Sequence, residues 1–169
     1  MAARSSVIHS VDSGSSSESK HVVFRVGPEL YGLPIERVER IVPSVTLTRI
    51  PRTPPMFLGV FDLRGETLPC LDLRLRFDMS PDGECAHFVV VQTNLGRVAL
   101  RVDEVDGIVM IRESDIEREL SMFERKDDPF VAGVAKNSEK LIVVLDPDEV
   151  VPKALRGKIV KHSAEPLAA

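Results

Sequence analysis

Residues 57–73 read Phe-Leu-Gly-Val-Phe-Asp-Leu-Arg-Gly-Glu-Thr-Leu-Pro-Cys-Leu-Asp-Leu, two apolar runs on either side of a charged turn. Gly65 can adopt the positive φ that a tight reversal often requires. The order of apolar run, short turn and apolar run is typical of a β-hairpin, here with Arg64 at its tip. A guanidinium held on a rigid turn is suited to binding a partner's carboxylate or carbonyl. The stretch therefore indicates a binding module.

The same stretch allows two simpler interpretations. Arg64 could be an exposed arginine in a surface salt bridge worth about 1 kcal/mol at most, and the residues alone favour this interpretation. Asp62, Glu66 and Asp72 could supply an acid–base pair. Carboxylates at turns, however, usually cap backbone N–H groups or stay solvated.

Length and charge restrict the function classes. The chain has 169 residues, a net charge of −4 and a pI near 5.6, which allows one domain or two small barrels that share a core. There is no block of lysine and arginine, so we expect no nucleic-acid partner. The longest apolar runs fall far short of the ~20 residues that span a bilayer, and the N-terminus has no continuous apolar segment typical of a secretion signal. Cys70 and Cys85 form no CxxC pair and fit a reduced cytoplasmic protein without membrane insertion.

Composition also predicts the domain boundaries. The serine-rich residues 1–20 contain few large apolar groups, so we expect a flexible tail there. Residues 21–155 should form the folded domain with two barrel subdomains, and residues 156–169 a second tail. Residues 152–169 are too short for a kinase, phosphotransfer or receiver segment, so we expect a standalone protein.

Short apolar runs separated by turn residues predict a fold made mainly of strands. Brief helices are expected from Pro34 to Val42, near 114–120 from the Ser114/Glu117 capping-box pattern, and from Asp146 until Pro152. Many short strands with brief helices favour an all-β fold of barrels over a parallel sheet. Besides the 57–73 hairpin, the predicted strands are 22–26, 30–33, 45–50, 87–91, 97–102, 105–111, 130–134 and 141–145.

The sequence contains little that indicates catalysis. It has no Gly-rich phosphate loop, no GxSxG and no HExxH. Cys85 and His87 lie two residues apart, but no second ligand pair with metal spacing accompanies them. We therefore expect no enzyme, no cofactor and no metal site.

A series of short motifs runs in order along the chain, and no single one of them is decisive. Through these motifs, residues 21–151 resemble the CheW-like domain of bacterial chemotaxis coupling proteins nearly end to end. The matches are Tyr31-Gly32, the 35–41 segment, Thr48-Arg49-Ile50-Pro51, Pro54 and Pro55, Gly59-Val60, Leu63-Arg64-Gly65, Pro69, Leu71-Asp72-Leu73-Arg74, Asn94-Leu95-Gly96, Val102-Asp103, Val105, Gly133 and 141–145.

The resemblance implies a fold and a function. The fold would be all-β, with two intertwined five-stranded SH3-like β-barrels around a shared core. The function would be that of a non-catalytic adaptor, cytoplasmic and recruited to membrane-associated receptor arrays. One barrel surface would pack against the regulatory domain of the histidine kinase CheA, and the groove between the barrels would take the cytoplasmic hairpin of a methyl-accepting receptor.

The resemblance also implies interface residues. Val38, Gly59 and Arg64 match positions implicated in receptor and kinase coupling, and apolar anchors with a few fixed polar groups suit such contacts. The predicted receptor- and kinase-binding residues are Val38, Arg40, Gly59, Asp62, Leu63, Arg64 and Gly65.

Three positions depart from the family pattern. Arg40 stands where the family commonly has Glu, Asp62 replaces a frequent Asn, and Ala99 a frequent Gly. A partner that faces Arg40 should carry a compensating acidic group. Two alternatives stay open: an adaptor of a chemosensory pathway unrelated to motility, and a small enzyme or ligand-binding barrel, which would need an enclosed pocket with convergent polar groups.

Overall fold

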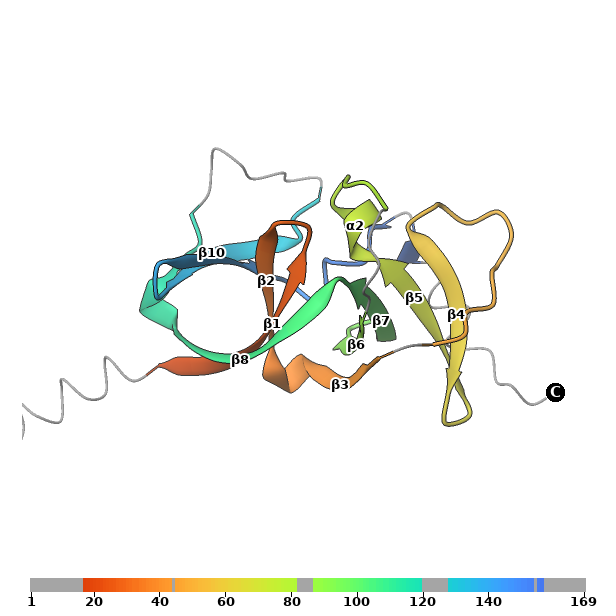
Figure 1. The fold of residues 1–169 in the computed structure, drawn as a ribbon, viewed down its shortest axis with the longest axis horizontal. Helices are drawn as coiled ribbons and strands as arrows, with labels where there is room; N and C mark the ends of the chain where they lie inside the picture. The colour runs from red at the N-terminus through yellow and green to blue at the C-terminus, as the bar shows by residue number, and fades with distance from the viewer. Residues whose placement is uncertain (1–16, 44, 82–86, 120–127, 154, 157–169) are drawn as a thin grey trace, which may run out of the picture.

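The structure, a computed structural model, describes residues 17–43, 45–81, 87–119, 128–153 and 155–156. It contains two sheets, one of six strands in the order β8-β1-β2-β11-β10-β9 and one of five in the order β3-β6-β7-β5-β4. The chain begins in the first sheet, builds the whole of the second, and then returns to finish the first. Figure 1 shows the two sheets side by side, each strongly curved. The predicted all-β, two-barrel fold is confirmed.

We call the unit built on the six-stranded sheet barrel 1. Its strands are β1 (Glu18–Val26), β2 (Glu29–Pro34), β8 (Glu104–Arg112), β9 (Ile116–Glu117), β10 (Val131–Asn137) and β11 (Lys140–Leu145), and the 3₁₀ turn η2 (Glu113–Asp115) joins β8 to β9. Its interior holds Val23, Leu30, Ile111, Ile116, Ala135, Ile142 and Val144. Only five strands were expected, and the sixth is the two-residue β9.

Barrel 2 is built on the five-stranded sheet. Its strands are β3 (Val38–Val42), β4 (Phe57–Leu63), β5 (Glu66–Asp72), β6 (His87–Thr93) and β7 (Gly96–Val102), and the short helix α2 (Leu73–Arg76) follows β5. Thr48, in the linker between β3 and β4, forms a bridge with Val60 that brings the linker against β4. The interior holds Phe61, Leu68, Cys70, Phe88, Val90 and Ala99.

A third core joins the barrels. Because successive residues of a strand face opposite sides, the residues that alternate with the barrel interiors face the other barrel. In β1, for example, Val23 faces the interior of barrel 1 while Phe24 faces the shared core. The largest buried members of the shared core are Phe24, Tyr31, Leu33, Phe57, Leu71, Leu73, Leu100, Leu145 and Leu155.

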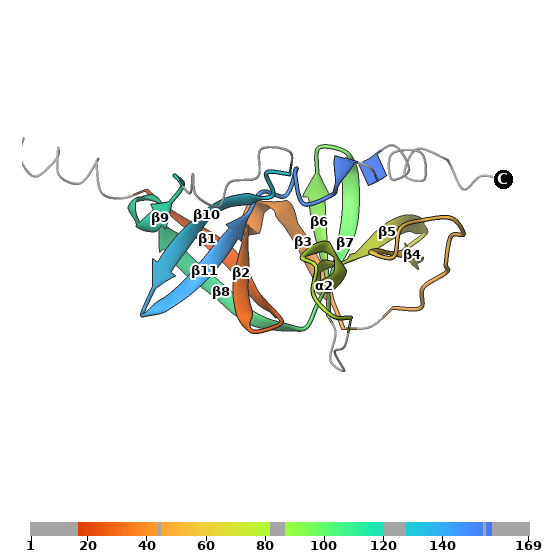
Figure 2. The same ribbon diagram turned by 90° about the horizontal axis from the view of Figure 1, so that it is seen from above.

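Within the described residues, the chain passes from one sheet to the other at η1 (Ile35–Arg37) and at Asp103. At the first crossing, Arg37 forms an ion pair with Asp148 and donates from Nε to the Gln92 carbonyl at 2.9 Å. At the second, Asp103 accepts hydrogen bonds from Arg74 and from the Gly27 N–H. Figure 2 shows α2 at the junction between the barrels.

The predicted helix from Pro34 to Val42 is wrong. Residues 35–37 form a 3₁₀ turn, and residues 38–42 form strand β3, paired with β6. A β-bulge explains why the apolar residues of β3 have the sequence spacing of a helix. Glu39 is the extra residue, so Val38 and Ile41 lie opposite Val91 and Val89 on one face although they are three apart in sequence.

Other local predictions also fail. The 45–50 strand reduces to the single bridge at Thr48, and the helix near 114–120 is replaced by η2 and β9, without a side-chain cap. After Asp146 the chain makes a turn, closed by the Val150 N–H on the Asp146 carbonyl at 3.0 Å, in place of the expected helix. β1 begins at Glu18, within the segment expected to be a tail. Residues 1–16 and 157–169 of the two expected tails lie outside the described residues.

Candidate partner-binding site

The hairpin of residues 57–72 is present and its geometry fixes Arg64 at the tip. β4 and β5 pair from Phe57 with Leu71 to Leu63 with Glu66, so Arg64 and Gly65 alone form the turn. Their φ angles are 53° and 88°, and two positive values characterise the type I′ turn that matches the twist of a hairpin. No heavy atom lies within 4 Å of a Cβ built on Gly65, so the residue is required there for its conformation.

The tip presents Arg64 to solvent. Arg64 is exposed and forms no ion pair with any residue in the part of the chain that the structure describes. Asp62 is also exposed, and its Oδ2 lies 3.4 Å from the Gly65 N–H, a long contact that supports the turn. The guanidinium of Arg64 is therefore available to a carboxylate on another molecule.

The three carboxylates considered as an acid–base set have separate structural roles. Glu66 pairs with Arg97, which also donates to both oxygens of Glu39 at 2.6 and 2.7 Å. Asp72 is 2% exposed; it caps α2 by accepting from the Arg74 N–H at 2.9 Å. Asp62 remains at the turn, so the structure does not bring the three together as a catalytic group.

Val38 and Arg40 lie on β3 but face different surroundings. Val38 packs partly buried against the shared core. Arg40 pairs with Val90, a residue of the barrel 2 interior, so its stem lies on the apolar side of the sheet. Its Nε is buried and has no hydrogen-bond partner among the described residues. Such an atom is costly to leave unpaired, which makes Arg40 an unusual residue at this edge.

Gly59 shapes the linker instead of presenting a side chain. It is buried with a φ of 135°, and a Cβ there would lie 2.3 Å from the Thr48 carbonyl oxygen. Thr48 and Val60 exchange backbone hydrogen bonds at 2.8 and 2.9 Å beside it. Only glycine allows the linker to approach β4 this closely.

The end of β3, the linker and β4 enclose a surface pocket of about 330 Å³. Asp62 and Leu63 belong to it, whereas Val38, Arg40 and Gly59 do not line it. Leu63 in this lining directly precedes the exposed Arg64 in the chain, so apolar side chains and a fixed charge lie close together at this end of the hairpin. The lining residues are Val42, Val45, Thr46, Phe61, Asp62 and Leu63.

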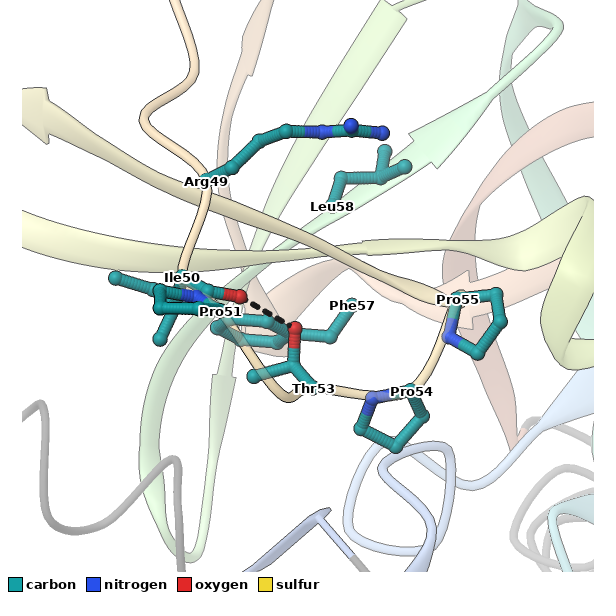
Figure 3. Close-up of a pocket in the computed structure, with 8 residues that line it drawn as sticks. All are labelled: Arg49, Ile50, Pro51, Thr53, Pro54, Pro55, Phe57 and Leu58. Carbon is teal, nitrogen blue, oxygen red and sulfur yellow. Dashed lines mark hydrogen bonds between the residues drawn. The ribbon is translucent and has the colours of Figure 1, made fainter.

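A second pocket, of about 400 Å³, lies under the proline-rich part of the linker. Figure 3 shows Pro51, Pro54 and Pro55 along its rim, with the Thr53 hydroxyl donating to the Ile50 carbonyl at 2.9 Å. Arg49, Phe57 and Leu58 complete the lining.

Exposed apolar residues on β3 and β8 were not predicted as a site, and Val131 on β10 and Leu141 on β11 are exposed as well. Ile108 and Met110 on β8 are 61% and 48% exposed, and Ile41 on β3 is 42% exposed. The alternation of exposed and covered residues along β8 is the signal that could have identified this face.

Nothing in the described residues resembles a metal site or a reactive thiol. Among them, no group of three His, Cys, Asp or Glu side chains could hold a metal ion. Cys70 is fully buried, and burial raises the pKa of its thiol, which keeps it protonated and unreactive. Cys85 lies outside the described residues. In the part that the structure describes, no helix has the length and apolar content needed to cross a bilayer.

Comparison with known proteins decides the family. Residues 20–155 match the family model of the CheW-like domain. The chain belongs to the CheW-like domain family. The chemotaxis protein CheW of Helicobacter pylori is 29% identical over 147 residues, covering 83% of this chain and 88% of that protein. CheW of Bacillus subtilis is 27% identical over 137 residues, covering 79% and 87%.

The crystal structure of the scaffolding protein TtCheW from Thermoanaerobacter tengcongensis is similar, with a TM-score of 0.72 and 33% identity over 78% of this chain and 91% of that one. The relatives of this CheW-like chain are thus chemotaxis and scaffolding proteins. Membership places the chain in an adaptor family of chemotaxis.

Proposed function

We propose that this CheW-like protein couples methyl-accepting chemoreceptors to the histidine kinase CheA, without catalysis of its own, in the cytoplasm at receptor arrays. The observation that carries the proposal is the Arg64 tip. An exposed arginine is held by a turn with two positive φ angles, and the two residues before it, Asp62 and Leu63, line a surface pocket. A rigid charge beside an anchor pocket is a common arrangement for protein recognition.

The kinase side of the proposal rests on barrel 2. A carboxylate on the regulatory domain of the kinase would pair with Arg64, while an apolar side chain would occupy the pocket lined by Phe61 and Leu63. Because Arg64 has no ion pair among the described residues, binding breaks no ion pair between its guanidinium and that part of the chain. The negative charge of Asp62, two residues before Arg64, would alter the strength of this ion pair.

The receptor side of the proposal rests on exposed apolar residues of both barrels. A helical hairpin binds a groove through apolar residues repeated along one helix face, and it requires apolar anchors opposite. Ile41 on β3 and Ile108 and Met110 on β8 are exposed apolar residues, one strand from each barrel. They are the anchors that we propose for the receptor.

The adaptor would act through geometry. When both partners bind one protein, each is held at a high effective concentration relative to the other. A change in receptor conformation can then alter kinase activity through the difference in contacts between two states. The charge of Arg40 adds a specificity element, because a partner surface facing it should be acidic.

Binding of each partner by purified variants tests the proposal. Arg64→Ala should lower affinity for the kinase regulatory domain by about tenfold or more, as loss of a central arginine usually does. The matched control is Lys136→Ala, which removes an exposed cation from β10 in barrel 1 and should leave affinity unchanged. Equal affinity of wild type and a folded Arg64→Ala variant for both the kinase domain and the receptor hairpin would show that the tip is not an interface.

A further inference from the structure

The segment from Leu73 to Met79 belongs to barrel 2 but makes its main side-chain contacts with barrel 1; we call it the α2 bracket. It begins where Asp72, the last residue of β5, caps the helix. The helix is too short to be stable alone, so its position depends on its contacts. Figures 1 and 2 both show it between β2 and the strands of barrel 2.

Phe77 inserts between two rings of barrel 1. Its centroid lies 4.7 Å from that of Tyr31 on β2 and 5.2 Å from that of Phe130, just before β10, with interplanar angles of 22° and 16°. Tyr31 in turn stacks on Phe24 at 6.3 Å. Stacked pairs at these distances favour particular relative orientations. Phe77 is the ring that barrel 2 contributes to this stack.

Arg76 holds Phe130, one of the two rings that contact Phe77, in place. Arg76 is 6% exposed and donates to both oxygens of Asp128, at 2.7 and 2.5 Å. Its Nε donates to the Val150 carbonyl at 2.7 Å, and the guanidinium carbon lies 4.5 Å from the centroid of Phe130. A buried arginine with this many partners holds the segments before β10 and after β11 in one arrangement.

Further contacts join the α2 bracket to Asp103 at the crossing and to Gly27 in the β1–β2 turn. Arg74 donates to both oxygens of Asp103, which also accepts from the Gly27 N–H at 2.7 Å. The Met79 sulfur lies 2.9 Å from the position that a Cβ on Gly27 would occupy. The α2 bracket therefore contacts barrel 1 at two separate places, which resists rotation of one barrel against the other.

We propose that Phe77 is a positioning residue that sets the angle between the barrels and thereby the spacing between the exposed apolar residues of β3 and those of β8. This inference rests on the proposed function, in which the kinase binds barrel 2 and the receptor binds the exposed apolar residues of both barrels. Phe77 is only partly buried and borders a surface cavity of about 600 Å³ together with Tyr31, Met56 and Phe130. Because the cavity gives the ring's neighbours room to move, loss of the ring permits the barrels to reorient without unfolding.

Distances between spin labels on the two barrels test the geometry directly. The labels would be placed at Lys136→Cys on β10 and Gln92→Cys on β6, both exposed, with Cys85→Ser in the background and the buried Cys70 left in place. Wild type should give one narrow distance distribution. Phe77→Ala should broaden or shift it, and Phe77→Leu should give an intermediate result. The matched control is Val144→Ala, which truncates a residue inside barrel 1 and should leave the distribution narrow.

A binding measurement supplies a readout that simple loss of stability would not move. Phe77→Ala should keep affinity for the kinase domain within about twofold of wild type, while affinity for receptor hairpins falls by about fivefold or more. An unchanged distance distribution in Phe77→Ala, or equal broadening in Val144→Ala, would overturn the positioning role. If wild type binds neither partner, the proposed function fails, and the spin-label distances still decide the role of Phe77.

Discussion

Asp103 accepts two hydrogen bonds from the guanidinium of Arg74, at 2.7 and 2.6 Å, at the point where the chain leaves barrel 2 for barrel 1. The side chains are 19% and 18% exposed, so the pair is largely shielded from solvent. The carboxylate also accepts from the Gly27 N–H in the β1–β2 turn. One side chain thus ties together α2, the crossing and the first hairpin.

Asp103→Asn should lower the free energy of unfolding by about 2 kcal/mol, because hydrogen bonds to charged groups contribute more than neutral ones. Urea denaturation would measure the loss. Glu18→Gln is the control: Glu18 pairs with Arg112 at the surface, where ion pairs contribute about 0.5 kcal/mol or less. Equal losses in the two variants would contradict the structural importance of the crossing.

Stability should fall as pH falls, in two stages. Burial lowers the pKa of His21 below its ordinary value of 6.5, although the Ser19 carbonyl, Glu36 and Glu113 oppose this. A lowered pKa in the folded state means that the stabilisation is present above the unfolded pKa and is lost as pH decreases below it. Chemical denaturation between pH 7 and pH 5 should show this loss, and His21→Gln should flatten it. A wild-type stability that is constant over this range would contradict the prediction.

The second stage involves Asp103. Burial alone would raise the pKa of its carboxyl, but hydrogen bonds from Arg74 and Gly27 outweigh burial and lower the pKa from its ordinary 3.8. Its contribution is therefore present above about pH 4 and is lost as pH falls through the lower folded value. Asp103→Asn should remove this acid-side dependence; an Asn variant that follows the wild-type curve below pH 4 would assign the loss to other groups.

Gly59→Ala should be far more damaging than Gly65→Ala, although both residues have positive φ. The added methyl at position 59 would meet the Thr48 carbonyl at 2.3 Å, whereas at position 65 it would meet nothing within 4 Å. We expect a loss of about 3 kcal/mol or more at Gly59, against about 1 kcal/mol at Gly65 from backbone strain alone. Thermal unfolding of both variants makes the comparison, and similar losses would mean that the linker can move aside.

Arg40→Met should weaken partner binding without lowering the stability of the fold. It keeps the apolar stem and removes the buried Nε that has no partner among the described residues, so stability should stay equal or rise by about 1 kcal/mol. Affinity for an acidic partner surface should decrease at the same time. Unfolding curves and partner titrations of the same variant provide both readouts. A clear loss of stability would indicate that the Arg40 head group is paired in solution.

The β4–β5 hairpin could be predicted because its determinants are local. Gly65 permits the turn, and the apolar runs before Asp62 and after Glu66 supply the two strands. β3 could not be predicted in this way. Its bulge at Glu39 gives a strand the apolar spacing of a helix, and only the edge of β6, distant in sequence, decides between them.

In the candidate site, too, locally determined features could be predicted and those that depend on distant segments could not. The position of Arg64 at the tip follows from the turn, whereas the pocket beside it requires Val42 and Val45 to fold back onto β4. The α2 bracket could not be predicted from the sequence, because a four-residue helix shows no periodicity and the ring partners of Phe77, on β2 and just before β10, are remote in sequence.

The order of strands has a consequence for synthesis of the chain. Barrel 2 is one continuous stretch, from Val38 to Val102, but β2 of barrel 1 pairs in parallel with β11, near the end of the domain, as in Tyr31 beside Val143. Pairing between such distant segments is slow, since a long loop must close first. On the ribosome, barrel 2 can therefore complete its sheet before β11 is synthesised. Until then, the edge of β2 that pairs with β11 has no hydrogen-bond partner strand. A nascent chain stalled before β11 should consequently be the species most prone to aggregate and most dependent on chaperones.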